Sequence, residues 1–213
     1  VDEVLAFLRR MAAAARPAAE RELAELEAFA GRKLDSWDVS YYSERLQEER
    51  YSISQEELRE YFPLPRVLEG LFEVIERLFQ VRILARDDVP LWHADARYYD
   101  LTDVQGKAIG GFYLDPYARP HKRSGAWMDD CVGRKRTQSG SALPVAYLVC
   151  NALRGNGDTP ALLTHDDVVT LFHEFGHGLH HMLTRVDYPS VAGINGVAWD
   201  AVELPSQFLE NYA

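Results

Sequence analysis

The sequence predicts an α+β fold in which helices predominate. Apolar residues recur at helical spacing through most of residues 1–81 and again through residues 165–183, whereas residues 97–150 contain segments with the alternation typical of strands. Helical runs at both ends with strands between them are typical of α+β proteins, in which helices pack on a small sheet. We therefore expect a helical first part and a mixed second part.

Helical spacing is strongest in four segments of the first part: residues 1–30, 36–51, 55–62 and 67–81. The first of them is rich in Ala, Glu and Arg, which are good helix formers, and Gly31 is placed to end it. Pro63 and Pro65 fall between the last two helices. We expect residues 1–85 to form a helical segment and residues 86–213 to form part of a second domain.

Strand-like alternation marks three segments of the second part: residues 97–102, 108–114 and 145–150. Gln105 and Gly106 lie between the first two of these segments, and a glycine there favours a tight turn. The sequence therefore predicts a small sheet that begins with a hairpin.

An amphipathic helix follows the strands and carries the sequence H-E-F-G-H at residues 173–177. Thr164 precedes Asp167 by three residues, which is the spacing of a capping box at a helix start. Apolar residues then recur at helical spacing: Val168, Val169, Leu171, Phe172, Phe175, Leu179, Met182 and Leu183. The motif is therefore expected on a largely buried helix.

The H-E-x-x-H spacing points to metal chemistry. His173 and His177 are four residues apart and share one helical face, so both imidazoles can bind the same ion. Glu174 lies beside the first histidine, where its carboxylate can take a proton from an activated water. Two His ligands with one Glu base are typical of zincins, so we expect a zincin-like core with one zinc ion per chain.

His181 continues the four-residue spacing, but it is too far away to complete this site. Eight residues at about 1.5 Å each place His173 and His181 about 12 Å apart along the helix, whereas Zn–N bonds are about 2 Å. We therefore expect His180 and His181 to pack, to support a ligand or to face solvent.

The third ligand is expected from a second helix, predicted at residues 200–210. Glu203 lies 26 residues beyond His177, which leaves enough chain to turn back at Gly193 and Gly196. Pro205 is expected to weaken this helix, because it removes a hydrogen-bond donor.

Asp200 and Glu210 are the two acidic residues placed to support a ligand histidine. Asp200 lies three residues before Glu203 and Glu210 lies seven after it, so either carboxylate could accept a hydrogen bond from a ligand imidazole. A solvated charge on the helix is the alternative for both residues.

The chain resembles the thimet oligopeptidase and neurolysin family of zinc peptidases, and its bacterial oligopeptidase A branch most of all. The resemblance is carried by HEFGHGLHH at residues 173–181 and VELPSQFLEN at residues 202–211. Four other segments fit as well: residues 61–63, 67–72, 111–119 and 125–133. This implies that His173, His177 and Glu203 bind zinc, and that Glu174 is the general base.

The resemblance also implies a two-lobed, mostly helical enzyme that cleaves short peptides in a deep channel. Members of this family are much longer than 213 residues, and their substrate-contacting tyrosines and histidines come from a later segment. We therefore expect a fragment that holds the metal site, belongs to the catalytic core over residues 86–213, self-associates and is weakly active by itself. The resemblance also places the exposed edge of the family's sheet at residues 125–127. A peptide substrate would be held extended there as an added strand.

Composition excludes several classes of partner. A net charge of −10 argues against nucleic acid and anionic membrane surfaces. No apolar run approaches the about 20 residues that cross a bilayer, and no signal peptide opens the chain, so we expect a cytoplasmic protein. The basic residues at positions 119–123 and 134–136 are either solvated or bind a peptide carboxylate.

Three functions remain open at this point. The first is a zinc metalloendopeptidase that hydrolyses internal bonds of short peptides. The second is a peptidyl-dipeptidase of the same superfamily, which would differ in how it holds the C-terminus of the substrate. The third is a non-catalytic metal-binding fragment.

Overall fold

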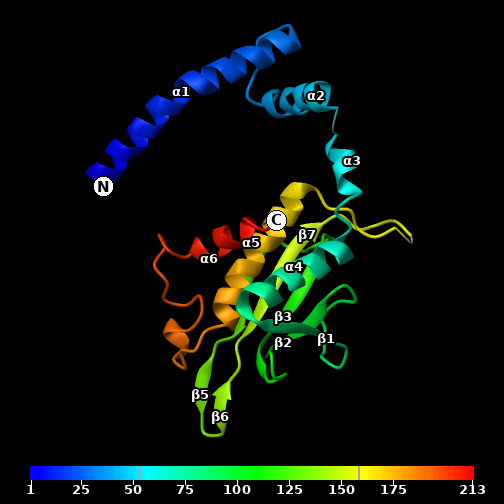
Figure 1. Ribbon diagram of the computed structural model, residues 1–213, viewed down its shortest axis with the longest axis vertical. Helices are drawn as coiled ribbons and strands as arrows, with labels where there is room; N and C mark the ends of the chain where they lie inside the picture. The colour runs from blue at the N-terminus through cyan, green and yellow to red at the C-terminus, as the bar shows by residue number, and fades with distance from the viewer. Residues whose placement is uncertain (53, 158) are drawn as a thin grey trace. The chain divides into compact units, whose positions relative to one another are not determined.

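The computed structural model describes residues 1–52, 54–157 and 159–213 (Figure 1). The chain forms two compact units, Val1–Glu57 and Leu58–Ala213. The expected boundary near residue 85 concerns the domains of a longer protein and stays a prediction. Among the described residues, no helix is both long enough and apolar enough to cross a membrane.

The first unit is helical. Helix α1 (Asp2–Ala30) ends at Gly31, which adopts the left-handed conformation with φ of 68°, as expected of a glycine that ends a helix. Helix α2 (Val39–Tyr51) packs on α1 through the Phe29 and Tyr42 rings. It begins three residues later than residue 36, because residues before Val39 form a turn. Helix α3 (Gln55–Arg59) is shorter than the expected helix to residue 62.

The second unit opens with helix α4 (Leu64–Phe79), which buries Leu64, Val67, Leu71 and Ile75 along one face. It starts earlier than residue 67, because Pro65 lies in the first turn, where a helix needs no N–H donor. It ends two residues before Val81, because Gln80 takes a left-handed conformation and the chain enters a strand.

A five-stranded sheet follows, with strand order β1-β2-β3-β7-β4. Its strands are β1 (Val81–Arg86), β2 (Arg97–Asp103), β3 (Ala108–Tyr117), β4 (Trp127–Val132) and β7 (Val145–Ala152). The three expected strands are therefore confirmed, and Gly106 forms the expected turn with φ of 82°. All pairings are antiparallel except that of β3 with β7. Strands β5 (Lys135–Thr137) and β6 (Gly140–Ala142) form a separate hairpin.

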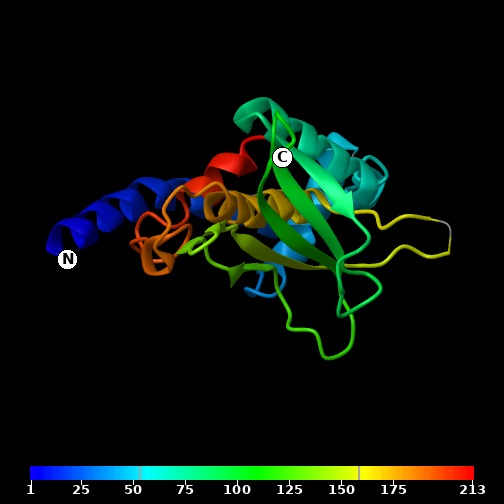
Figure 2. The same ribbon diagram turned by 90° about the horizontal axis from the view of Figure 1, so that it is seen from below.

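Helices α4 and α5 (His165–Met182) cover one face of this sheet. Phe72 of α4 contacts both Phe112 of β3 and Phe175 of α5, so the three elements share one core. Helix α5 runs along β7, and α6 (Leu204–Glu210) lies beside α5 (Figures 1 and 2). The short 3-10 turn η1 (Pro189–Val191) lies in the connection between them. The fold is therefore α+β, with a small sheet beside the helix of the motif.

Candidate metal centre

The first turn of α5 sets the position of the motif. The Asp167 backbone N–H donates to Thr164 Oγ1 at 3.1 Å, and the Thr164 N–H donates back to Asp167 Oδ2 at 2.8 Å. This pair is the expected capping box, which satisfies two N–H groups that a helix start leaves unpaired. Phe175 packs on Phe112 of β3 and Gly178 lies against Leu148 of β7, so the opposite side of the helix presents His173 and His177 away from the sheet.

His173, His177 and Glu203 meet at one point. The His173 Nε2 and His177 Nε2 atoms lie 3.2 Å and 3.1 Å from Glu203 Oε2, and the ligand atoms of all three residues lie within 4.8 Å of one another. Tetrahedral zinc with ligands at about 2.1 Å separates those ligands by about 3.4 Å. The group therefore fits the His, His and Glu set of a zincin site.

Glu203 reaches the histidines because α6 crosses α5 very closely. A Cβ added to Gly176 would lie 2.5 Å from the Pro205 carbonyl oxygen and 2.6 Å from Ser206 Cα. A side chain at residue 176 would therefore collide with the backbone of α6, which no rotamer change can relieve. The glycine inside the motif is what permits this crossing.

The expected helix at residues 200–210 is wrong at its start. Residues 200–203 form turns, and α6 begins at Leu204 with Glu203 as its N-terminal capping position. Pro205 therefore lies in the first turn, where its missing N–H costs nothing, and it does not weaken the helix. The returning connection turns at Gly193 and Gly196, which have φ of 63° and 75°.

Two neighbours hold the Glu203 carboxylate and His173 in place. Ser206 Oγ lies 2.9 Å from Glu203 Oε2, within hydrogen-bond distance. Burial favours a higher pKa for Glu203, but the Ser206 hydrogen bond and the neighbouring histidines lower that pKa overall. Glu210 Oε1 lies 2.6 Å from His173 Nδ1, so its carboxylate can fix the orientation of the ring that offers Nε2 to the group.

Asp200, the other acidic residue considered for this position, is exposed. Its carboxylate forms no hydrogen bond or ion pair within the described parts of the chain. Ser206 was not singled out from the sequence, because a serine three residues after a glutamate is too common a pattern to identify a contact.

Glu174 is buried beside the histidines. Burial raises the pKa of its carboxyl group, the nearby histidine His173 lowers it, and the charge of Glu203 raises it further. The main chain of Met128, in β4, lies close enough to act on this carboxyl. Glu174 therefore lies between the group of His173, His177 and Glu203 and the outer strand of the sheet.

The remaining histidines of α5 lie outside the group. His181 is fully buried, with Nε2 3.0 Å from the Val132 carbonyl oxygen, and Gly193 packs against it so closely that a Cβ would lie 2.7 Å from Nδ1. Burial lowers the pKa of His180 and of His177, which favours neutral rings. A neutral imidazole is the form that binds a metal ion.

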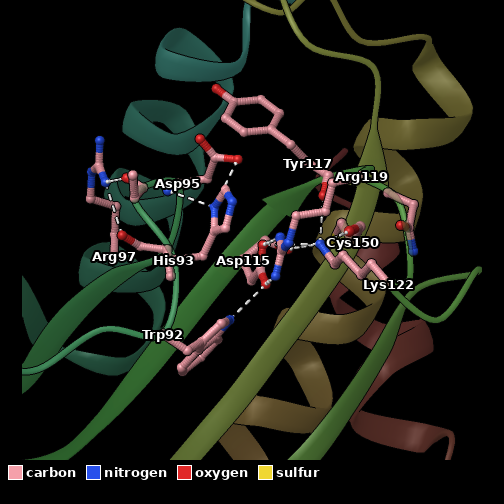
Figure 3. Close-up of polar contacts among 12 residues, drawn as sticks. Trp92, His93, Asp95, Arg97, Asp115, Tyr117, Arg119, Lys122 and Cys150 are labelled. Carbon is pink, nitrogen blue, oxygen red and sulfur yellow. Dashed lines mark hydrogen bonds and ion pairs between the residues drawn. The ribbon is translucent and has the colours of Figure 1, made fainter.

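Two of the basic residues after β3, Arg119 and Lys122, bind Asp115 (Figure 3). Arg119 donates two hydrogen bonds of 2.7 Å to the buried Asp115 carboxylate, and Lys122 Nζ donates one of 3.0 Å. Trp92 Nε1 donates a further one at 3.0 Å. Burial favours a higher pKa for Asp115, but these donors lower that pKa to about 2. This cluster fixes the segment between β3 and β4.

Known proteins match the chain along its entire length. The family model of peptidase family M3 matches residues 1–213. Oligopeptidase A of Haemophilus influenzae is 55% identical over 216 residues, which cover 99% of this chain and 32% of that protein. Organellar oligopeptidase A of Arabidopsis thaliana is 46% identical over 225 residues, which cover 100% of this chain and 28% of that protein.

A third relative has a name that indicates a different activity. Dipeptidyl carboxypeptidase of Escherichia coli is 38% identical over 218 residues, which cover 100% of this chain and 32% of that protein. The chain thus spans about a third of the length of the curated relatives it matches. Since the family match includes every residue of the chain together with the H-E-x-x-H helix described above, the chain belongs to peptidase family M3.

Proposed function

We propose that this chain supplies the metal centre of a zinc endopeptidase that cleaves internal bonds of short peptides. The observation that carries the proposal is the meeting of His173, His177 and Glu203 beside the buried carboxylate of Glu174. Membership of peptidase family M3 supports hydrolysis of peptide bonds as the reaction. The name oligopeptidase A, borne by the relative at 55% identity, supports short peptides as substrates.

One zinc ion per chain is part of this proposal, with His173, His177 and Glu203 as its ligands. A bound zinc ion would supply the Lewis acid that activates the attacking water and polarises the scissile carbonyl. Glu210 would hold the His173 ring through Nδ1, and Ser206 would hold the Glu203 carboxylate.

Glu174 would move the proton of the reaction. Its carboxylate accepts a proton from the attacking water and then returns that proton to the nitrogen of the leaving amine. The surroundings of Glu174 support this role, because a buried carboxylate with a raised pKa is a better match for proton transfer near neutral pH than an exposed one.

Strand β4 would hold the substrate. It is the last strand in the sheet order, so among the described residues no further strand lies beside its outer edge, where an extended peptide could be added. It begins at Trp127, the last residue of the segment 125–127 where the edge was expected, and its Met128 main chain acts on Glu174. A peptide added to this edge would pass beside the metal group.

Two alternatives are separable by experiment. The dipeptidyl carboxypeptidase relative favours an exopeptidase as second candidate. The test uses an internally quenched peptide with both ends blocked and the zinc-loaded longer protein. Cleavage in the interior supports the endopeptidase, whereas release of dipeptides only from peptides with a free C-terminus supports the exopeptidase. A zinc-binding protein that cleaves neither peptide would be a non-catalytic metal-binding protein.

The compartment also stays a prediction. Relatives in Arabidopsis thaliana carry the names probable cytosolic oligopeptidase A and organellar oligopeptidase A. We propose the cytoplasm, as expected from the sequence, and fractionation of cells that produce the longer protein would test it.

A further inference from the structure

His181 binds the backbone of the edge strand from inside the fold. The ring is fully buried on α5, and its Nε2 atom lies 3.0 Å from the carbonyl oxygen of Val132, the last residue of β4. Because a carbonyl oxygen can only accept a hydrogen bond, Nε2 carries the proton and donates it. The end of the edge strand is therefore hydrogen-bonded to the helix of the motif.

The sheet by itself holds this end of the strand less regularly than the start. The register of β4 against β7 shifts between Asp130 and Val132, whereas the pairing is regular from Trp127 to Asp130. A shift of this kind leaves a residue of the strand unpaired and disrupts the ladder locally. The bond from His181 thus acts where strand pairing is interrupted.

A second residue of α5 lies against the same strand. Glu174 precedes His181 by seven residues, about two helical turns, so the two side chains share one face of α5. The main chain of Met128 lies beside the Glu174 carboxylate, four residues before Val132. Two turns rise about 10.5 Å and four strand residues span about 13 Å, so the two contacts are similarly spaced along both elements. The strand therefore contacts α5 both beside Glu174 and at His181.

The connection between α5 and α6 (residues 183–203, orange in Figures 1 and 2) packs against the same end of β4. Arg134 Nε lies 2.7 Å from Asp187 Oδ1, and Asn195 Nδ2 donates to Asp130 Oδ2 at 3.1 Å. This connection leads to Glu203, the third proposed ligand. The end of the edge strand and the chain that carries Glu203 are thus joined by direct contacts.

Gly193 of this connection closes the other side of the His181 ring. A Cβ at Gly193 would lie 2.7 Å from His181 Nδ1 and 2.8 Å from His181 Cα. The Nδ1 atom is buried and has no hydrogen-bond partner within the described parts of the chain. The polar contact of the ring is therefore the one to Val132, and the close backbone of Gly193 limits how far the ring can move from it.

We propose that His181 is a positioning residue for substrate binding, which fixes the later half of β4, Asp130 to Val132, so that this half can pair with an extended peptide. The inference rests on the proposed peptidase function and assigns to His181 the binding of peptide residues farther from the cleaved bond. Since Met128 lies next to Glu174, a peptide must extend about two residues from the cleaved bond before it reaches Asp130.

The orientation of the peptide decides which of its sides depends on His181. A peptide antiparallel to β4 places its amino side along Asp130 to Val132, and antiparallel pairing is slightly more stable per residue than parallel pairing. We therefore expect the residues before the cleaved bond to depend on His181.

The test uses the zinc-loaded longer protein and three internally quenched peptides with blocked ends. The core peptide has two residues on each side of the cleaved bond, the second peptide adds three residues on the amino side, and the third adds three on the carboxyl side. The kcat/KM ratio of each longer peptide to the core peptide measures what that extension contributes. We expect an amino-side ratio of about five or more in the unaltered protein, the factor that one net hydrogen bond contributes.

Two substitutions of His181 separate the hydrogen bond from the volume of the ring. His181→Met fills the space without a donor, so the amino-side ratio should fall to about one. His181→Gln offers an amide N–H near the position of Nε2 and should retain most of the ratio. The carboxyl-side ratio should stay unchanged in both variants, because that side of the peptide does not reach Val132. Zinc content and thermal unfolding establish that each variant is folded.

A pair of glycine variants tests the same contact with His181 intact. Gly193→Ala adds a methyl group that displaces the ring from Val132, so it should lower the amino-side ratio. Gly196→Ala is the matched control, because Gly196 lies in the same connection with φ of 75° and its Cβ would meet the Ser190 carbonyl oxygen at 2.9 Å instead of His181. It carries similar backbone strain and should leave the ratio unchanged.

The outcomes separate the inference from the proposed function. An amino-side ratio near one in the unaltered protein, or one that survives in both His181→Met and Gly193→Ala, would overturn the role of His181 and leave the peptidase intact. Equal losses for all three peptides would show that His181 only stabilises the fold, which also overturns it.

Two other results are equally decisive. A loss confined to the carboxyl-side ratio would support the role of His181 with a peptide that lies parallel to β4. If the unaltered protein bound zinc but cleaved none of the three peptides, the proposed function would fail and this inference with it.

Discussion

Glu174 and His177 lie one turn apart on α5, yet their proposed tasks are separable. In the longer protein, Glu174→Gln should retain zinc and lose activity by about 100-fold to 10,000-fold, because the amide cannot accept a proton. His177→Ala should lose both zinc and activity, because it removes a ligand. Metal analysis and kcat/KM on a quenched peptide measure the two effects. Substantial activity in Glu174→Gln would remove the general base from the proposal.

Asp115 offers a test of pH dependence away from the metal group. Its folded-state pKa of about 2 lies below the usual value near 4, so the charged form stabilises the fold above pH 4. That contribution, about 2 kcal/mol, should disappear as the pH falls from about 4 through about 2. Asp115→Asn should therefore differ most from the unaltered chain at pH 5 and much less near pH 2.

Urea unfolding at several pH values measures this difference. Asp87→Asn, which removes an exposed carboxylate after β1, is the matched control and should change the profile little. An Asp115→Asn difference that stayed constant between pH 5 and pH 2 would show that the Asp115 cluster gains nothing from ionisation.

At the scale of the helices, the crossing of α5 and α6 depends on one missing side chain. Gly176→Ala should push α6 away and weaken zinc binding by about 10-fold to 100-fold, as loss of support around metal ligands usually does. Gly70→Ala is the control, because nothing lies within 4 Å of a Cβ at that helical position. It should leave zinc binding intact and stabilise the chain by up to about 1 kcal/mol.

Competition with a chromophoric chelator measures the zinc affinities of both variants. Equal affinity in Gly176→Ala and Gly70→Ala would mean that α6 can shift without moving Glu203. Each substitution adds one methyl group and removes no backbone carbonyl or N–H group. The comparison therefore isolates the effect of a methyl group at residue 176.

Elements with a strong local pattern were predictable from the sequence, and elements defined by their partners were not. The capping box at Thr164 and the turn at Gly106 were predicted because each is specified by adjacent residues. Strand β1 was missed because Val81 continues the apolar spacing of α4. Strand β4 was expected only as a short edge, because Asp129 and Asp130 interrupt the apolar alternation that marks a strand.

In the candidate site too, features set by local sequence were predictable and features set by packing partners were not. The spacing of His173 and His177 within one helix indicates that they share a face. By contrast, the 3.1–3.2 Å approach of Glu203 depends on the packing of α6 against Gly176, which no local pattern contains. Pro205 was misread because its effect depends on where the helix begins, and helix starts are the least certain feature of a sequence.

At the scale of the whole chain, an apolar groove predicts association. It has a volume of about 650 Å³ and is lined by side chains of α4, α5 and α6, among them Phe79, Leu183, Leu204 and Phe208. Leu204 is 72% exposed and Phe208 is 46% exposed. Apolar surface of this kind favours association in water. We therefore expect the isolated 213-residue chain to associate with itself in a concentration-dependent way.

Sedimentation velocity across about 1–100 μM, a range that brackets the micromolar affinity of weak complexes, measures this association. Phe208→Lys should shift the chain toward monomer. Val104→Lys replaces another exposed apolar residue, in the β2–β3 turn, and should not. A chain that remained monomeric throughout this range would contradict the prediction.

The proposed ligands His173, His177 and Glu203 join a helix of seven residues, α6, to the long buried helix α5. An ion bound by both helices is bound only while they are docked, so its binding free energy opposes local unfolding of α6. With free ion at 100 times its Kd, binding raises the free energy of this local unfolding by about 2.7 kcal/mol, which makes the unfolded form of α6 roughly a hundredfold rarer. The supply of metal would thus set how long the 183–203 connection resists a protease. Lack of metal would then shorten the lifetime of the protein as well as abolish its proposed activity.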